Sequence, residues 1–302
     1  MTTPTNPGSP WSGPTWTELL APTRLTAVVD IGANPIDGDP PYKPMMDAGL
    51  CTVTGFEPQA EALAKLLAVK GPHERYLRKA IGDGGDHELK VTWMNGMTSL
   101  FEPDVVRLSA LNEFARYGEV LQRVPVSTTR LDDVEEIVDL DLLKIDVQGA
   151  ELMVFRNGRR KLAGAVAVHA EVAFVPLYHD QPLFADVDAE LRSQGFVPHA
   201  MAALKRWPIA PGVLGGDIFA THQQLLEADV AYVKDFAHLE LLDDEQLRHL
   251  ALLAHHVYSS PDLVVRCLVE LLDRAHVDPD VVPAYGGELG VELTTNGVRS
   301  DR

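Results

Sequence analysis

From Ala27 onward, short apolar runs alternate with longer stretches whose apolar positions have helical spacing. The short runs have the length and composition of buried strands: "AVVDIGAN", "TVTGFEP", "RYLRKAIGD", "LLKIDVQGAE" and "AVAVHAEVAF". The longer stretches include "QAEALAKLLAVK" and "LFADVDAELRSQGF". Strands that alternate with helices indicate βαβ units and therefore parallel strands. The pattern predicts an α/β protein with a doubly wound, mostly parallel sheet.

The remaining segments complete this outline. "HELKVTWMN" alternates and predicts an additional strand, "VVRLSALNEFARYGEVL" predicts a helix, and "FVPHAM" and "GDIFATH" predict two short final strands. After His222 the sequence predicts helices in "LLEADVAYVKDFAHLELLDDEQLRHLALLAHHV" and "SPDLVVRCLVELLDRAHV". We therefore expect three parts: a flexible tail over residues 1–20, a sheet domain over 21–222, and a helical extension over 223–302 with a frayed end.

The apolar faces of the extension need a cover. They can pack on the sheet domain of the same chain or on a second subunit. Since symmetric dimers are the commonest oligomers, the extension favours a homodimer.

Charge and composition narrow the class of partner. The net charge is -18 and the pI is about 4.9, so the surface repels phosphate backbones and nucleic acid is not expected as a partner. Two cysteines, Cys51 and Cys267, are too few for a disulfide framework or a zinc cluster. The N-terminal residues have no apolar core typical of a signal peptide, and no stretch reaches the roughly 18 apolar residues of a membrane span. These features predict a cytoplasmic protein without a membrane partner.

Five carboxylates follow five predicted strands: Asp30, Glu57, Asp83, Asp146 and Glu171. Each alone is explained by the preference for acids at helix N-termini. The carboxyl ends of parallel strands share one edge of the sheet, and ligands of open α/β sheets bind there. Five acids along that edge favour a ligand rich in hydroxyls, amines or positive charge.

The turn after the first strand indicates which ligand this is. Glu57 has the spacing of an acid that binds ribose hydroxyls in nucleotide-binding folds. The turn itself reads "GANPIDGDPPYK", where Asn34 replaces the second glycine of a pyrophosphate-binding G-x-G-x-x-G. A nucleoside without phosphates fits better, and S-adenosyl-L-methionine is such a molecule. Asp30, Gly32, Asn34, Glu57 and Asp83 are therefore the candidate cofactor-binding residues. An NAD-dependent oxidoreductase or epimerase is the rival, although it needs the pyrophosphate turn.

The motifs "VVDIGAN", "GFEP", "TRLDDV" and "LLKIDVQGAE" resemble those of the FkbM family of S-adenosylmethionine-dependent methyltransferases. The resemblance covers roughly Ala27 to His222. It implies a class I methyltransferase with a seven-stranded sheet, the cofactor over the first two strand ends, and a small-molecule methyl acceptor, mostly a hydroxyl of a natural product or sugar. The chain departs from the family by a longer loop after "GAN" and by Gln148 where the family's "KIDVEG" has an acid. Gln148 keeps open a third interpretation, a non-catalytic binding protein that kept the fold.

Methyl transfer to a hydroxyl requires alignment of acceptor, methyl and sulfur, and a base that takes the proton. The candidate catalytic residues are Asp146, His169 and Glu171. His169 is equally compatible with a satisfied core histidine. As an alternative, Asp146 and Glu171 bind Mg²⁺, which lowers the pKa of the acceptor.

Overall fold

The computed structural model describes residues 13–33, 38–220, 223–291 and 293 of the 302-residue chain. The chain divides into two compact units. Thr26–Lys234 forms the larger unit, and the smaller unit combines Met1–Leu25 with Asp235–Arg302.

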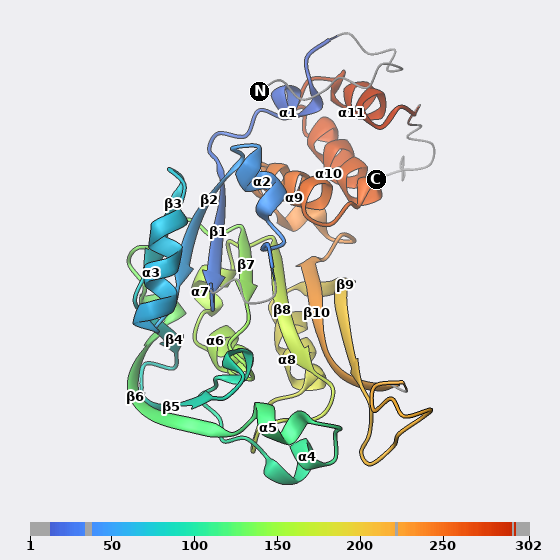
Figure 1. Ribbon diagram of the computed structural model, residues 1–302. Coiled ribbons are helices and arrows are strands. Elements are labelled where there is room, and N and C mark those ends of the chain that lie inside the picture. Colours follow the sequence, from blue (N-terminus) through green and yellow to red (C-terminus); the bar gives the residue numbers. More distant parts are fainter. Residues whose placement is uncertain (1–12, 34–37, 221–222, 292, 294–302) are drawn as a thin grey trace. The chain divides into compact units, whose positions relative to one another are not determined.

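A seven-stranded sheet is the centre of the larger unit (Figure 1). Its spatial order is β3-β2-β1-β7-β8-β10-β9, with the bounds β1 (Thr26–Ile31), β2 (Cys51–Phe56), β3 (Glu74–Leu77), β7 (Leu142–Ile145), β8 (Ala167–Ala173), β9 (Phe196–Trp207) and β10 (Gln224–Lys234). Within this sheet β1, β2, β3, β7 and β8 are parallel, and β10 is antiparallel to both β8 and β9. The prediction of a mostly parallel, seven-stranded sheet is confirmed.

Helices connect and cover these strands. They are α2 (Lys43–Asp47), α3 (Ala60–Val69), α6 (Glu151–Arg156), α7 (Arg159–Leu162) and α8 (Phe184–Ser193). One apolar cluster joins the sheet to α6 and α8, and in it Phe155, Val168 and Leu191 are fully buried. β8 is buried along its whole length, as expected of a parallel strand in the interior of a sheet. The strand order reverses between β1 and β7, which makes their carboxyl ends the topological switch point.

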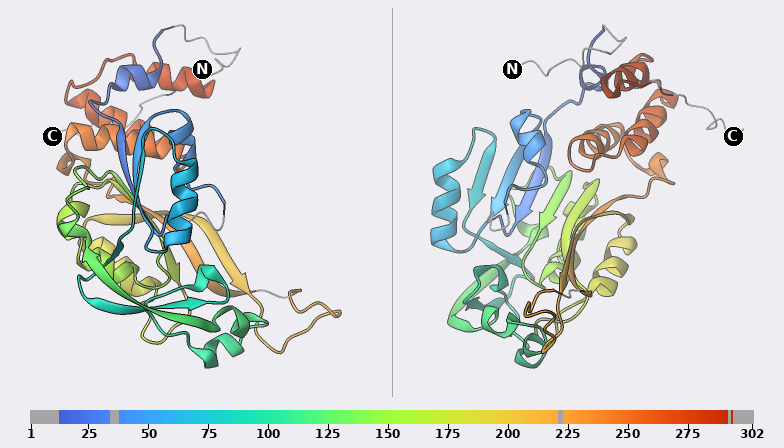
Figure 2. Two further views of the ribbon diagram at one scale, coloured as in Figure 1. Left: turned by 60° about the vertical axis from the view of Figure 1, so that its left-hand side comes forward. Right: turned by 45° about the vertical axis from the view of Figure 1, so that its right-hand side comes forward.

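A smaller sheet of three strands is inserted between β3 and β7. It has the order β4-β6-β5, with β4 (Ala80–Gly82), β5 (Asp86–Thr92) and β6 (Val120–Arg130). The same insertion contains α4 (Val105–Ser109), α5 (Phe114–Tyr117) and the 3-10 turn η1 (Asn95–Met97). It lies toward the carboxyl ends of the parallel strands (Figure 1, Figure 2).

Two predictions in this insertion need correction. The single helix expected over "VVRLSALNEFARYGEVL" is two short helices, and β6 already begins at Val120. The strand expected over "RYLRKAIGD" is divided into β3, which belongs to the large sheet, and β4, which belongs to the small one. No glycine or proline separates the two strands, so no local feature of the sequence marks the break.

The predicted boundary at residue 222 is wrong. Gln224–Lys234, expected to be helical, is strand β10 in the interior of the large sheet. A strand buried on both faces carries apolar residues in succession, and this run is easily mistaken for a buried helix. "GDIFATH" forms no strand over its described residues, 216–220, and "FVPHAM" is the beginning of the twelve-residue β9.

The smaller unit is helical. It contains α1 (Trp16–Leu20), α9 (Asp244–His256), α10 (Pro261–Asp273), α11 (Val281–Leu289) and the 3-10 turn η3 (Leu239–Leu241). The 3-10 turn η2 (Leu131–Asp133) belongs to the larger unit. The apolar faces of these helices cover one another: Leu250 of α9 and Leu268 of α10 are fully buried. The expected homodimer stays a prediction, because the helices supply much of their own cover.

The N-terminal segment contains a packed helix, α1. Residues 1–12 lie outside the described residues, but Trp16 is 0% exposed and its ring lies 4.9 Å from that of Tyr285. α1 begins with a capping box in which Thr15 and Glu18 bond reciprocally. The expectation of flexibility up to residue 20 is therefore wrong for α1. None of the described helices is long and apolar enough to cross a membrane, and the cytoplasmic location stays a prediction.

Trp16→Ala is expected to destabilise the helical unit by about 3–5 kcal/mol, since it removes a fully buried indole and leaves a cavity. Hydrogen exchange of the amides in α9 to α11 measures this loss. Leu241→Ala is the matched control, because Leu241 is 78% exposed, and it should change protection little. Equal protection in both variants would show that Trp16 does not anchor the unit.

Candidate functional site

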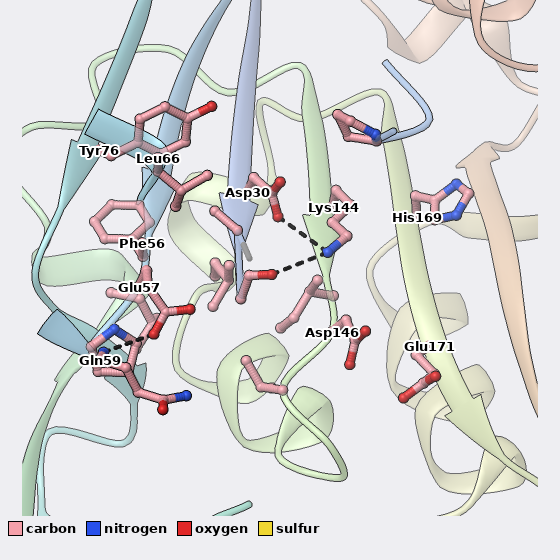
Figure 3. A pocket seen from close by; sticks show the side chains of 18 of the residues that line it. Asp30, Phe56, Glu57, Gln59, Leu66, Tyr76, Lys144, Asp146, His169 and Glu171 are labelled. Carbon is pink, nitrogen blue, oxygen red and sulfur yellow. Dashed lines mark hydrogen bonds and ion pairs between the residues drawn. The ribbon is translucent and has the colours of Figure 1, made fainter. Parts of the chain in front are cut away.

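A cavity of about 820 Å³ lies at the carboxyl ends of the parallel strands within the larger unit (Figure 3). The turn after β1, the end of β2 and the end of β7 form its walls on the side of the large sheet, and the small sheet contributes Leu89 and Val126. Of the predicted site residues, it is lined by Asp30, Gly32, Glu57, Asp146, His169 and Glu171. Asn34 lies outside the described residues, and Asp83 is not part of the lining.

Gly32 allows the end of β1 to approach the end of β7. Its φ is +79°, and a Cβ atom there would lie 2.0 Å from the carbonyl oxygen of Asp146. Its amide donates to the carbonyl of Phe56 on β2 at 3.1 Å. The glycine is therefore required by the contact between two strand ends. It also lines the cavity, and its role in cofactor binding stays a prediction.

Asp30 is held by two protein groups. It is 3% exposed; the Tyr42 hydroxyl donates to its Oδ2 at 2.5 Å, and the Lys144 ammonium lies 3.4 Å from its Oδ1. Lys144 also donates to the carbonyl of Gly32 at 3.3 Å. Burial lowers the pKa of Lys144, but the carboxylates of Asp30 and Asp146 outweigh it, and the pKa is raised. Asp30 and Lys144 thus form a structural ion pair at the floor of the cavity.

Glu57 presents a carboxylate at the end of β2. It is 3% exposed, and its Oε1 accepts a hydrogen bond from the amide of Gln59 at 2.7 Å. Within the described part of the chain, no hydrogen bond reaches its Oε2. Burial raises the pKa of Glu57, and the bond from Gln59 offsets part of this effect. One oxygen is fixed by the chain, and the other is left for a ligand in the cavity.

The prediction that Asp83 lies among the cofactor-binding residues is wrong, for a structural reason. It follows β4, which belongs to the small sheet, so it does not lie at the edge of the large one. Its Oδ1 accepts hydrogen bonds from the amide of Gly85 and from His87, both at 2.8 Å. The bonds from His87 and Gly85 lower the pKa of Asp83 to about 2. This carboxylate closes a surface turn.

Gln148 connects the two candidate catalytic carboxylates. Its Nε2 donates to Asp146 Oδ1 at 2.9 Å and to Glu171 Oε2 at 2.5 Å. The Tyr178 hydroxyl lies 3.0 Å from Gln148 Oε1. Gln148 is therefore the centre of the polar contacts at this end of the cavity. From the sequence it was only a departure from the family motif.

Glu171 also binds Lys205, which the sequence did not predict as a site residue. The Lys205 ammonium donates to Glu171 Oε1 at 2.8 Å and lies 3.6 Å from Glu227 Oε2. Burial raises the pKa of Glu171 and also that of Glu227, the latter to about 7. Both oxygens of Glu171 accept hydrogen bonds, so the geometry favours Glu227 as the carrier of a proton near neutral pH. Lys205 was missed because β9 was predicted to end at Met201.

His169 lies beside Lys144 on the neighbouring strand, with the two residues in register. It is 6% exposed, and burial together with the charge of Lys144 lowers its pKa to about 4. Its imidazole is therefore neutral at pH 7. Figure 3 shows Glu171 near Asp146, while His169 lies farther from the carboxyl end of β8. Glu171 and Asp146 are brought together as predicted, and His169 is placed apart from them.

The carboxylate pair does not fit a divalent metal. No group of three or more His, Cys, Asp or Glu side chains in the described residues could hold a metal ion. A hydrogen-bond donor, the amide of Gln148, lies between Asp146 and Glu171, and an ammonium occupies the other oxygen of Glu171. Mg²⁺ prefers several oxygen ligands and retained waters. The Mg²⁺ alternative is thus not supported.

Comparison with known proteins assigns a family. The model of the methyltransferase FkbM domain matches residues 30–198. No curated protein sequence gives a significant match. Similar solved structures include a protein from Thermoplasma acidophilum considered to be a methyltransferase, with 10% identity over 70% of this chain and 68% of that chain and a TM-score of 0.37.

Two further structures are of named enzymes. Precorrin-6y C5,15-methyltransferase from Geobacter metallireducens has 13% identity over 72% of this chain and 86% of that chain, with a TM-score of 0.33. Magnesium protoporphyrin IX methyltransferase from Synechocystis has 11% identity over 73% of this chain and 76% of that chain, with a TM-score of 0.31. Likenesses this distant add no argument about function, which depends on the family match and the site.

Gly32→Ala is expected to destabilise the larger unit by about 1–3 kcal/mol more than Gly195→Ala. Both glycines have positive φ, +79° and +81°, but only at Gly32 does the new Cβ meet another backbone atom. Urea unfolding with hydrogen exchange at the β1 amides measures both losses. If the two variants are equally destabilised, the contact between Gly32 and Asp146 is looser than described.

Proposed function

The chain belongs to the FkbM methyltransferase family, and from this premise we propose that it transfers the methyl group of S-adenosyl-L-methionine to a hydroxyl of a small polar metabolite, sugar or natural product. The observation that carries the proposal is the half-satisfied carboxylate of Glu57 at the end of β2, in the wall of the cavity. A carboxylate that keeps one oxygen for a ligand suits the two neighbouring hydroxyls of a ribose.

Three features of the chain support S-adenosyl-L-methionine as the nucleoside. The apolar side chains of Phe56, Leu66 and Ile81 line the cavity close to Glu57 and offer a surface for a base. The turn after β1 lacks the glycines of a pyrophosphate site, which argues against NAD. The eight carboxylates along the lining outnumber its four lysines, which favours a cationic sulfonium.

Within this proposal each residue has a definite task. When bound, S-adenosyl-L-methionine supplies an electrophilic methyl group. Glu57 holds the ribose, while Asp30 and Lys144 keep the turn after β1 in place against β7. Asp146 orients the acceptor hydroxyl and takes up its proton, because Gln148 fixes its Oδ1 and leaves the carboxylate at the wall of the cavity. Positioning of this kind supplies up to roughly 7–11 kcal/mol in well-aligned intramolecular reactions.

Asp146 is a better candidate for the base than its two neighbours. Both oxygens of Glu171 already accept hydrogen bonds, from Gln148 and Lys205. His169 is neutral and able to accept a proton, but it lies toward the floor of the cavity beside Lys144. Polar groups of the insertion, Asn95 and Thr98, line the cavity and suit an acceptor with several hydroxyls.

Glu57→Ala is expected to weaken binding of S-adenosylhomocysteine by about 1.5–3 kcal/mol, the range for a hydrogen bond to a charged group. Isothermal titration calorimetry measures the change. Glu61→Ala is the control, because Glu61 is an exposed acid on α3. The affinity of this variant for S-adenosylhomocysteine should match that of the unchanged protein. Binding of NAD without any response to S-adenosylhomocysteine would contradict the proposal.

Asp146→Asn is expected to slow methyl transfer about 100- to 10,000-fold, the usual contribution of a general base. The asparagine keeps an oxygen for Gln148, so affinity for S-adenosylhomocysteine should be retained. Mass spectrometry of methylated products from a panel of sugars and polyols measures the rate. A larger loss in His169→Asn would assign the base to His169 instead, and cofactor binding with no turnover on any acceptor would favour the non-catalytic alternative.

A further inference from the structure

Asp146 and Glu171 approach one another at one end of the cavity, which we call the acceptor end. The group between the two carboxylates is the neutral amide of Gln148. The Gln148 Nε2 atom lies 2.9 Å from Asp146 Oδ1 and 2.5 Å from Glu171 Oε2. A primary amide nitrogen has two hydrogens, so it can donate one to each carboxylate at the same time. Gln148 thus places partial positive charge where proteins with paired carboxylates often place a cation.

The backbone of Gln148 is built into this position. Its φ is +52°, a left-handed conformation that non-glycine residues rarely adopt. The hydroxyl of Ser99, which is 1% exposed, donates to the carbonyl of Gln148 at 2.6 Å. The hydroxyl of Tyr178, which is fully buried, lies 3.0 Å from the side-chain oxygen of Gln148 and 3.0 Å from the carbonyl of Met97, so its one proton is shared between two acceptors. An arrangement held from both sides, in an unfavourable conformation, indicates a specific role.

We propose that Gln148 is a positioning residue that replaces a cation: its amide holds Asp146 and Glu171 together at the acceptor end, and the reaction proceeds there without a divalent metal. The proposal deepens the proposed function, on which it rests, by assigning the site to metal-independent transfer. Asp146 is then kept in one orientation by a hydrogen bond, and its charge is only partly neutralised.

The same distances indicate what the substitution Gln148→Glu would create. A carboxylate at position 148 would have an oxygen about as close to Asp146 and Glu171 as the amide nitrogen is. Adjacent ligands of an octahedral Mg²⁺ or Mn²⁺ ion lie about 3 Å apart, given metal–oxygen distances of about 2.1 Å. Three carboxylate oxygens at such separations repel one another without a cation and together coordinate one. Gln148→Glu should therefore convert the corner into a site for a divalent metal.

The test uses the full chain and Mn²⁺, whose free concentration is followed by electron paramagnetic resonance. We expect Gln148→Glu to bind Mn²⁺ at least tenfold more tightly than the unchanged protein, and its melting temperature to rise with Mn²⁺. The matched control is the double variant Gln148→Glu with Glu171→Gln, which restores one amide to the cluster and should lose the tight binding. Folded Gln148→Glu that binds Mn²⁺ no better than the unchanged protein overturns the proposal.

A second measurement does not depend on the folding of that variant. Mn²⁺ binding by the unchanged protein, if Asp146→Asn abolishes it, would show that the natural site takes a metal and would overturn the proposal. S-adenosylhomocysteine binding, measured on the same sample, reports separately on the proposed function, because Glu57 lies at the other end of the cavity.

Gln148→Leu tests the positioning role itself, since leucine fills similar space without a donor. The charged groups around Glu171 are Asp146 after β7, Lys205 on β9, and Glu227 and Asp229 on β10. Loss of the amide leaves no donor between Glu171 and Asp146, although Lys205 still binds Glu171. The titration of Glu171, followed by carboxyl carbon NMR, should therefore move upward by at least one pH unit. An unchanged titration in the folded variant would mean that Gln148 only fills space, and would overturn the proposal.

Discussion

The ion pair between Lys144 and Asp30 is the interaction on which the site depends. It lies at the switch point of the sheet, where β1 and β7 are neighbours, and both groups are largely buried. Burial of one charge without its partner costs several kcal/mol, so each of the two residues requires the other. The Lys144 ammonium also holds the carbonyl of Gly32, and that turn can pass so close to Asp146 only because residue 32 has no side chain.

Carboxylates in a cavity repel one another, and three side chains limit this repulsion. Lys144 partners Asp30, Lys205 bridges Glu171 and Glu227, and the amide of Gln148 lies between Asp146 and Glu171. Glu57 has the least support, since only a backbone amide reaches it among the described residues. The fixed charges are therefore concentrated where the proposed reaction would position its atoms, and the unbound oxygen of Glu57 lies where a ribose would bind.

The sequence predicted the parts of the fold that follow from local pattern. Parallel strands with buried runs, and the acids at their ends, were identified because strand period and chain order fix which edge they share. Asp83 was misplaced because the chain leaves the large sheet between Leu77 and Ala80 without any turn residue to mark it. The strand Gln224–Lys234 was taken for a helix because its burial on both faces removes the alternation that identifies a half-buried strand.

The contacts inside the site were less predictable, because they join residues far apart in the sequence. Lys205 reaches Glu171 across 34 positions and Tyr178 reaches Gln148 across 30. Neither pairing has a spacing that a motif could reveal. Gln148 was noticed only as a substitution within "KIDVQG", and its role as a donor between two carboxylates depends on where β8 places Glu171.

The two ends of the cavity are built from different parts of the chain. The end with Glu57 comes largely from β1, β2 and their turns, which come first among the strands in chain order. The acceptor end draws on the insertion, where Ser99 holds the backbone of Gln148 and the carbonyl of Met97 accepts from Tyr178. Under the proposed function, acceptor choice would depend on this insertion through the orientation of Gln148. Ribose binding would depend on Glu57 at the end of β2, outside the insertion.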